Sequence, residues 1–238
     1  MSEKKKGIDF EQTREQLHRQ MLSTVSHDLK TPLATMIGSL EIYTRMLDKL
    51  SPEKRAMLVQ SALSEAYRLD HFITNILDMA KLEGGLVVVK CEMLDLNSLI
   101  EDSITRLGPR AKLHTINLNM PSEVCRVFCD PTLLSRAVGL VIDNATKHAG
   151  KNAIIDVSFG GKECDFFVRV ADNGTGIPPG REEEIFSKYA RIARNDQQNA
   201  GTGLGLSICR QMMHMVGGSV VAENTPNGGA IFTLRCPA

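Results

Sequence analysis

Ser26-His27-Asp28-Leu29-Lys30-Thr31-Pro32-Leu33 is the stretch that decides the fold, because it places an imidazole beside a carboxylate on a long helical pattern. Apolar residues recur near heptad spacing on one face of this pattern: Leu22, Val25, Leu29, Met36, Tyr43 and Leu50. On a helical wheel His27 lies about 200° from Val25 and Leu29, so it points toward water. Thr31 shares the face of His27, and Asp28 lies about 100° round. By itself this pattern favours an ordinary, solvated surface histidine over a functional one.

A second helical pattern follows the first. The first pattern runs from about Ile8 to Leu50, and Pro32 should bend it because proline lacks a backbone donor. Ser51-Pro52-Glu53 indicates a new helix start, and Gly84-Gly85 ends that helix. Such a hairpin cannot bury both apolar faces alone, so we expect a homodimer built on a four-helix bundle. The alternative is a monomer whose hairpin packs on the rest of the chain.

After Gly85 the pattern changes to short strands and helices. Expected strands cover residues 86–90, 115–120, 124–129, 153–159, 166–171, 220–223 and 230–234, with a turn at Gly160-Gly161. Expected helices cover residues 96–107, a segment that begins at Pro131, and residues 207–215. The fold class is therefore α+β: a long antiparallel helical hairpin over residues 1–84, followed by an α/β sandwich over residues 85–238 with helices on one face of a mixed sheet.

Composition excludes several classes of function. Among the 238 residues, Lys+Arg and Asp+Glu are equal at 28 each, so the net charge gives no field for nucleic acid or for an anionic membrane. No apolar run approaches the roughly 18 residues that span a bilayer, and the start of the chain lacks a signal peptide core. The six cysteines are scattered without zinc-site spacing, which indicates reduced cytoplasmic thiols. We expect no nucleic-acid partner and no membrane contact from this segment.

Three further stretches carry candidate chemistry. Asn144, Lys147 and His148 share one face of the helix that begins at Pro131, where they could serve a metal ion, a phosphate and a base, or simply be solvated. Asp172-Asn173-Gly174-Thr175-Gly176-Ile177-Pro178 follows a strand and suits recognition of an adenine amino group, although a tight turn explains it equally well.

Gly201-Thr202-Gly203-Leu204-Gly205-Leu206 leads into a helix, whose free N–H groups favour phosphate. Neither a dinucleotide-binding fingerprint nor a Walker phosphate loop fits this stretch, because no strand precedes it and no Gly-Lys-Ser/Thr ends it. A lid over a nucleotide, from about residue 179 to 200, fits better.

The order and spacing of these stretches resemble the sensor histidine kinases of two-component signalling, whose catalytic domain has the gyrase/Hsp90/MutL type of ATP-binding fold. Residues 26–33 resemble the H box of that family, 143–148 its N box, and 185–191 its F box. Residues 172–176 and 201–205 resemble its two glycine boxes. Within the family, the sequence is most similar to the KdpD-type potassium sensor kinases.

The resemblance implies a phosphotransfer site on the hairpin. His27 would accept the γ-phosphoryl group of ATP, and Asp28 would polarise its ring as general base. Thr31 matches the family position that orients water in the reverse, phosphatase reaction. The partner would be the receiver domain of a response regulator, and the segment would be cytoplasmic, as part of a longer, membrane-anchored sensor.

The resemblance also implies an ATP site with Mg²⁺ in the second domain. Asn144 would bind Mg²⁺, Lys147 would contact phosphate, and His148 would lie against adenine. Asp172 would accept from the adenine amino group. The remaining implied nucleotide-binding residues are Gly174, Gly176, Arg191, Thr202, Gly203, Leu204 and Gly205.

Leu140 departs from the family pattern. The N box usually has a second asparagine four residues before the Mg²⁺ ligand, and Leu140 occupies that position here. The departure raises an alternative, in which the chain is a catalytically weak, nucleotide-binding dimeric scaffold that docks a response regulator. A third reading, a serine kinase or other ATPase on the same nucleotide fold, does not explain His27 on a hairpin.

Overall fold

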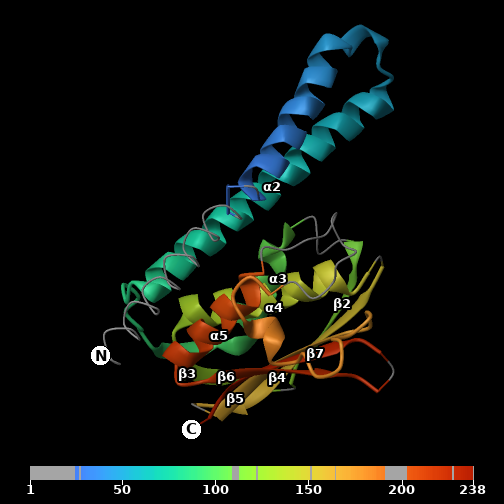
Figure 1. Ribbon diagram of the computed structural model, residues 1–238. Helices are drawn as coiled ribbons and strands as arrows, with labels where there is room; N and C mark the ends of the chain where they lie inside the picture. Colours follow the sequence, from blue (N-terminus) through green and yellow to red (C-terminus); the bar gives the residue numbers. More distant parts are fainter. Residues whose placement is uncertain are drawn as a thin grey trace, which may run out of the picture. The chain divides into compact units, whose positions relative to one another are not determined.

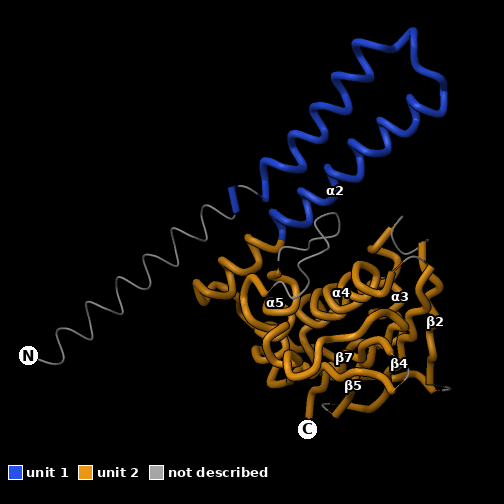
Figure 2. The backbone as a smooth tube through the Cα atoms, turned by 45° about the vertical axis from the view of Figure 1, so that its right-hand side comes forward, with its two compact units in different colours: residues 1–74 blue, residues 75–238 orange. Residues whose placement is uncertain are grey.

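The computed structural model describes residues 25–26, 28–108, 113–121, 123–150, 152–163, 165–190, 203–226 and 228–237. The chain divides into two compact units, residues 1–74 and residues 75–238 (Figure 2). The domain division expected from the sequence, after residue 84, stays a prediction. No helix in the described ranges is long and apolar enough to cross a membrane.

The first unit holds the helical hairpin, and the long helix α2 (Pro52–Glu83) continues from it into the second unit (Figure 1). Residues 28–45 are helical without a break at Pro32. The 3-10 turn η1 (Leu47–Lys49) follows, so the helix ends before Leu50, where the sequence predicted its end. In this turn the backbone N–H groups of Lys49 and Leu50 both donate to the Met46 carbonyl oxygen. Helix α2 begins as predicted, with the Ser51 hydroxyl accepting from Lys54 N at 3.4 Å.

The second unit contains two sheets. Strands β1 (Glu92–Asp95) and β3 (Arg126–Cys129) form an antiparallel pair. The larger sheet has the strand order β2-β4-β5-β7-β6. Its strands are β2 (Thr115–Asn119), β4 (Ile154–Lys162), β5 (Asp165–Asp172), β6 (Ser219–Asn224) and β7 (Ala230–Cys236). The β2–β4 pair is parallel and the others are antiparallel, so the predicted mixed sheet is confirmed.

Three helices cover one face of the larger sheet, as predicted (Figure 1). They are α3 (Leu96–Arg106), α4 (Pro131–His148) and α5 (Gly205–Met215), and the short helix η3 (Glu184–Phe186) precedes α5 in the chain. Helix α4 begins where the sequence predicts, because the Asp130 carboxylate accepts from Thr132 N at 2.9 Å and from Leu133 N at 3.0 Å. Its apolar face forms the centre of the core between α3, α5 and the sheet.

Two local predictions are wrong. Residues 86–90 alternate between exposed and half-buried but pair with no strand in the described part of the chain, and the strand lies instead at β1. Lys90 N donates to the Asp130 carboxylate at 2.7 Å, so a side chain takes the place of a strand partner. The predicted turn at Gly160-Gly161 lies inside β4, and the chain reverses at Glu163, whose φ is 53°. Gly161 instead allows close packing, since a Cβ built there would lie 2.5 Å from Phe166 Cα.

Candidate functional site

Helix α4 is the element around which the candidate nucleotide-binding stretches gather. A Cβ built at Gly174 would lie 2.6 Å from Ala149 Cα and 3.0 Å from the His148 carbonyl oxygen, so the first glycine box touches the end of α4. A Cβ built at Gly205 would lie 3.6 Å from Leu140 Cδ2, so the second glycine box touches its middle. Two stretches that are far apart in the sequence therefore flank the helix that carries the N box.

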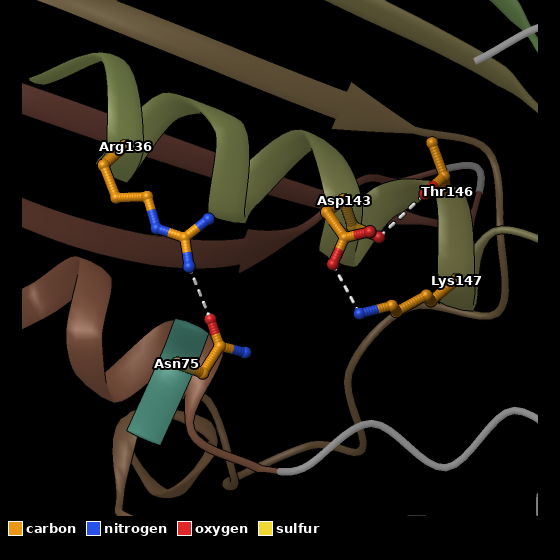
Figure 3. A network of polar contacts seen from close by, with 5 residues as sticks. All are labelled: Asn75, Arg136, Asp143, Thr146 and Lys147. Carbon is orange, nitrogen blue, oxygen red and sulfur yellow. Dashed lines mark hydrogen bonds and ion pairs between the residues drawn. The ribbon is translucent and has the colours of Figure 1, made fainter. Parts of the chain in front are cut away.

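One stripe of α4 is polar (Figure 3). Arg136, Asp143 and Lys147 lie on it at i, i+7 and i+11. The Lys147 ammonium forms an ion pair with Asp143, and Thr146 Oγ1 donates to the Asp143 carbonyl oxygen at 2.8 Å. Because Asp143 neutralises Lys147, a phosphate group that used this ammonium would have to share it or displace the carboxylate.

The other two polar residues of the N box differ in exposure. Asn144 is half-buried. His148 is exposed at the last position of α4. The amide oxygen of Asn144 is the hard, neutral ligand type that Mg²⁺ accepts.

No cluster of three or more His, Cys, Asp or Glu side chains that could hold a metal occurs in the described ranges. The Asn144 amide therefore fits one protein ligand to a Mg²⁺ ion whose other ligands come from elsewhere.

Asp172 is buried at the end of β5, with 8% of its surface exposed. Its Oδ1 accepts from Gly174 N at 2.9 Å and from Ala230 N at 3.3 Å. These two bonds fix the carboxylate through one oxygen and orient the other oxygen as an acceptor. Such a carboxylate can recognise a ligand that presents an N–H donor, as the exocyclic amine of adenine does.

Asn224 holds the first glycine box in place from β6. Its Oδ1 accepts from Ile177 N at 2.6 Å, and its Nδ2 donates to the Ile177 carbonyl oxygen at 2.7 Å. Gly176, with φ of +74°, passes so close that a Cβ there would lie 2.6 Å from Asn224 Oδ1. The sequence did not single out Asn224 as a site residue, and no local spacing could have revealed a contact across 47 positions.

The turn before α5 packs against the F box. Gly203 has φ of +67°, and a Cβ there would lie 2.7 Å from the Tyr189 carbonyl carbon. Tyr189 N donates to the Gly203 carbonyl oxygen at 2.9 Å. Leu204 is buried at the N-cap of α5 and provides no side-chain cap. The N-cap residue itself therefore supplies no side-chain acceptor to the first N–H groups of α5.

The remaining predicted site residues are divided between the units. Asp28 is half-buried and Thr31 is exposed, both within the helical residues 28–45 of the first unit. His27, Arg191 and Thr202 lie outside the described residues, as do residues 191–200 of the expected lid. The described part of the second unit places Gly174 beside Asp172 and His148, and Gly205 beside Leu140 of the same helix that carries Asn144 and Lys147.

Burial raises the pKa of two groups near these stretches. Full burial raises the pKa of the Cys209 thiol in α5 to about 12. Burial, and secondly the charge of Glu83, raises the pKa of the Tyr189 phenol. Both groups are therefore neutral at physiological pH, and neither supplies a charge to the site.

Comparison with known proteins gives two family models along the chain. Residues 17–85 match the His Kinase A (phospho-acceptor) domain, and residues 129–238 match the histidine kinase-, DNA gyrase B- and HSP90-like ATPase. The sensor protein KdpD of Escherichia coli strain K12 is 35% identical over 226 residues, which cover 94% of this chain and 25% of KdpD. The chain thus spans about a quarter of that relative's length.

Solved structures show the same fold. The catalytic domain of histidine kinase ThkA is 27% identical with a TM-score of 0.55, and the match covers 62% of this chain and 95% of that domain. The ThkA structure in complex with the response regulator protein TrrA has a TM-score of 0.67 at 24% identity, covering 96% of this chain and 66% of ThkA.

Proposed function

Because the chain belongs to the sensor histidine kinases of two-component systems, we propose that it transfers the γ-phosphoryl group of ATP to His27 and then to an aspartate of a response regulator receiver domain. The observation that carries this proposal is the contact of both glycine boxes with α4, at Gly174 and at Gly205. We also propose that the chain has two domains with separate roles. Residues 1–84 form the hairpin that carries His27, and residues 85–238 form the domain that binds ATP.

The adenine and the phosphates would use different parts of the second domain. Asp172 would accept from the adenine amino group through the oxygen that its backbone partners leave open, with Gly174 and Gly176 allowing close approach and His148 against the ring. The turn Gly203–Gly205 and the first N–H groups of α5 would hold the phosphates. Lys147 would exchange part of its contact with Asp143 for a phosphate oxygen.

Asn144 would hold Mg²⁺ beside the phosphates. Bound there, Mg²⁺ would offset the negative charge that builds up on the phosphoryl oxygens during transfer. Arg191 and Thr202 are proposed to contact the same nucleotide. The rest of the chain's contribution is positioning, since phosphoryl transfer needs alignment and charge neutralisation more than covalent chemistry.

At the H box, we propose that the imidazole of His27 attacks the γ-phosphorus while the oxygen bridging to ADP leaves. Asp28 would keep the reacting nitrogen unprotonated by binding the proton on the other ring nitrogen. Thr31 would orient a water molecule in the reverse direction, for a phosphatase reaction on the regulator. ATP and reduced thiols are found together in the cytoplasm, so we propose that this segment acts there.

The hairpin surface supports a homodimer. Three exposed apolar residues of the first helix fall within about 60° of one another on a helical wheel: Leu33, Ile37 and Leu40. A matching stripe on α2 includes Val59, Leu63 and Tyr67. A second copy of the hairpin would cover both stripes in a four-helix bundle, and monomeric proteins seldom leave such stripes in water.

The sharpest test is incubation with γ-labelled ATP and Mg²⁺, comparing the wild type with His27→Gln. We expect acid-labile, base-stable label on the wild type alone, and its transfer to a purified receiver domain. Label that persists in His27→Gln would show a different acceptor residue. His27→Gln should still bind ATP, which separates loss of the acceptor from loss of the nucleotide site.

One observation favours a second candidate, the catalytically weak scaffold. Leu140 is buried, with 5% of its surface exposed, and it faces Gly205 at the start of α5. An apolar side chain therefore occupies the N-box position where the family usually has an amide. In the labelling experiment, measurable ATP binding without label on the wild type would support the scaffold and overturn the kinase.

A further inference from the structure

Arg210, in the middle of α5, holds both ends of the short segment that contains η3. Its guanidinium lies over the Phe186 ring, 4.0 Å from the ring centroid. Its Nη2 also donates to Glu183 Oε2 at 2.8 Å. A planar cation stacks on an aromatic face and bonds to a carboxylate at its edge, and only arginine does both at once.

Phe186 is fixed from the other side as well. It is buried, with 4% of its surface exposed, and its ring meets that of Phe232 on β7 edge to face, with centroids 6.4 Å apart. The ring therefore lies between a strand of the main sheet and the Arg210 guanidinium. Removing the guanidinium would leave the Phe186 ring without its contact on the α5 side, while its contact with Phe232 on the sheet would remain.

The position of Phe186 bears on the turn before α5. Three residues after Phe186, Tyr189 N donates to the Gly203 carbonyl oxygen at 2.9 Å. Gly203 packs so tightly on Tyr189 that a Cβ would come within 2.7 Å of the Tyr189 backbone. A shift of the F-box segment would therefore move Gly203, and with it the backbone that leads into Gly205.

We infer that Arg210 is a positioning residue for the phosphate groups of the nucleotide: it acts through Phe186 and Tyr189 to fix the Gly203–Gly205 turn. This inference rests on the proposed function. Arg210 lies five residues into the helix from Gly205 and contacts neither Asp172 nor its backbone partners in the described structure. Replacing Arg210 should therefore weaken the binding of ligands that carry phosphates, and it should leave the binding of the adenine ring unchanged.

Isothermal titration calorimetry of the full chain with ATP, ADP and adenosine tests this, using Arg210→Met, which keeps the aliphatic stem. We expect the affinities for ATP and ADP to fall about threefold to tenfold, the size of one guanidinium–aromatic contact. The affinity for adenosine should stay within about twofold of the wild type. Arg210→Lys keeps a charge for Glu183 but cannot stack as a plane, so it should lose most of the same affinity.

Arg181→Met is the matched control. Arg181 also forms an ion pair on this segment, with Glu184 three residues on, but that pair is exposed and does not touch Phe186. It should bind all three ligands as the wild type does. Glu183→Gln should also have little effect, because the Glu183 side chain is 81% exposed.

Three outcomes would overturn the inference: unchanged ATP affinity in Arg210→Met, an equal loss for adenosine and ATP, or an equal loss in Arg181→Met. Thermal unfolding of each variant shows whether it folds, and if Arg210→Met does not, Arg210→Lys decides by the same comparison. Wild-type protein that fails to bind ATP would refute the proposed function itself. Wild-type binding with no effect of Arg210 refutes only the present inference.

Discussion

The Arg136 guanidinium of α4 donates from Nη2 to Asn75 Oδ1 of α2 at 2.7 Å, across 61 positions of sequence (Figure 3). Its Nε donates to Asp78 Oδ2 at 2.8 Å. Asn75 is buried, with 7% of its surface exposed, and Met79 and Leu82 lie in the hydrophobic core of the second unit. The last turns of α2 thus form part of the nucleotide-binding unit, although the helix itself begins in the hairpin.

Arg136→Met should destabilise the second unit by about 1 to 3 kcal/mol, because it leaves the buried Asn75 amide and the Asp78 carboxylate without their donor. Urea unfolding followed by circular dichroism measures this. The two units need not unfold together, so added ATP should identify the transition of the second unit by shifting it alone.

Arg181→Met is the control for Arg136→Met. Arg181 and Glu184 form an ion pair in the second unit whose side chains are exposed. Its loss should leave the free energy of unfolding almost unchanged, as for other exposed ion pairs. Equal effects of the two substitutions would show that the contact with Asn75 adds no stability.

Asp172→Asn should lower ATP affinity at least about tenfold while leaving the fold intact. The asparagine oxygen can still accept from Gly174 N and Ala230 N, but the other atom becomes an N–H donor that faces the adenine amine. Nucleotide titration measures the loss, and size-exclusion chromatography with light scattering checks the dimer. Asp165→Asn, at the exposed start of β5, is the control and should bind normally.

Leu63→Glu should dissociate the homodimer, because it would bury a charge in the proposed bundle. Met57→Glu places the same charge on α2 about 120° away from the stripe, at a residue that is 65% exposed. Light scattering at several concentrations should show a monomer for Leu63→Glu and a dimer for Met57→Glu. A dimer in both would mean that the exposed stripe is not the interface.

Much of this fold could be predicted from local sequence signals, for physical reasons that particular residues illustrate. Asp130 and Pro131 set the start of α4 within one turn, so cap chemistry was sufficient to place it. The turn at Glu163 was missed because glycines usually mark turns, whereas Gly161 serves a tight contact with Phe166. Asn75, Arg136, Asn224 and Arg210 carry contacts between distant segments, which helical or strand periodicity does not encode.

Leu140→Asn should raise the affinity for Mg²⁺-ATP relative to ATP in EDTA, because it adds an amide beside the turn at Gly205. Without nucleotide it should lower stability by about 1 to 3 kcal/mol, since a buried polar group lacks a partner there. Calorimetry with and without Mg²⁺ measures the first effect. Leu140→Ala is the control. It also removes the leucine side chain but adds no amide, so Mg²⁺ should not raise its affinity for ATP beyond the effect seen in the wild type.

Stability should fall as pH rises above about 9, and Cys209 should account for part of the fall. Full burial raises the pKa of its thiol from 9.0 to about 12 in the folded chain. Between these values the unfolded thiol has lost its proton while the folded thiol keeps it, so each unit of pH costs up to about 1.4 kcal/mol of stability. Below pH 9 both states are protonated, and the contribution is constant.

Cys209→Ala should therefore show a shallower loss of stability between pH 9 and 10.5 than the wild type, by about one proton. Some dependence on pH will remain, because burial also raises the pKa of Cys125. Urea unfolding at a series of pH values gives the slope, which is independent of any stability that the substitution itself removes at neutral pH. Identical slopes for Cys209→Ala and the wild type would show that the Cys209 thiol ionises in the folded chain as readily as in the unfolded one.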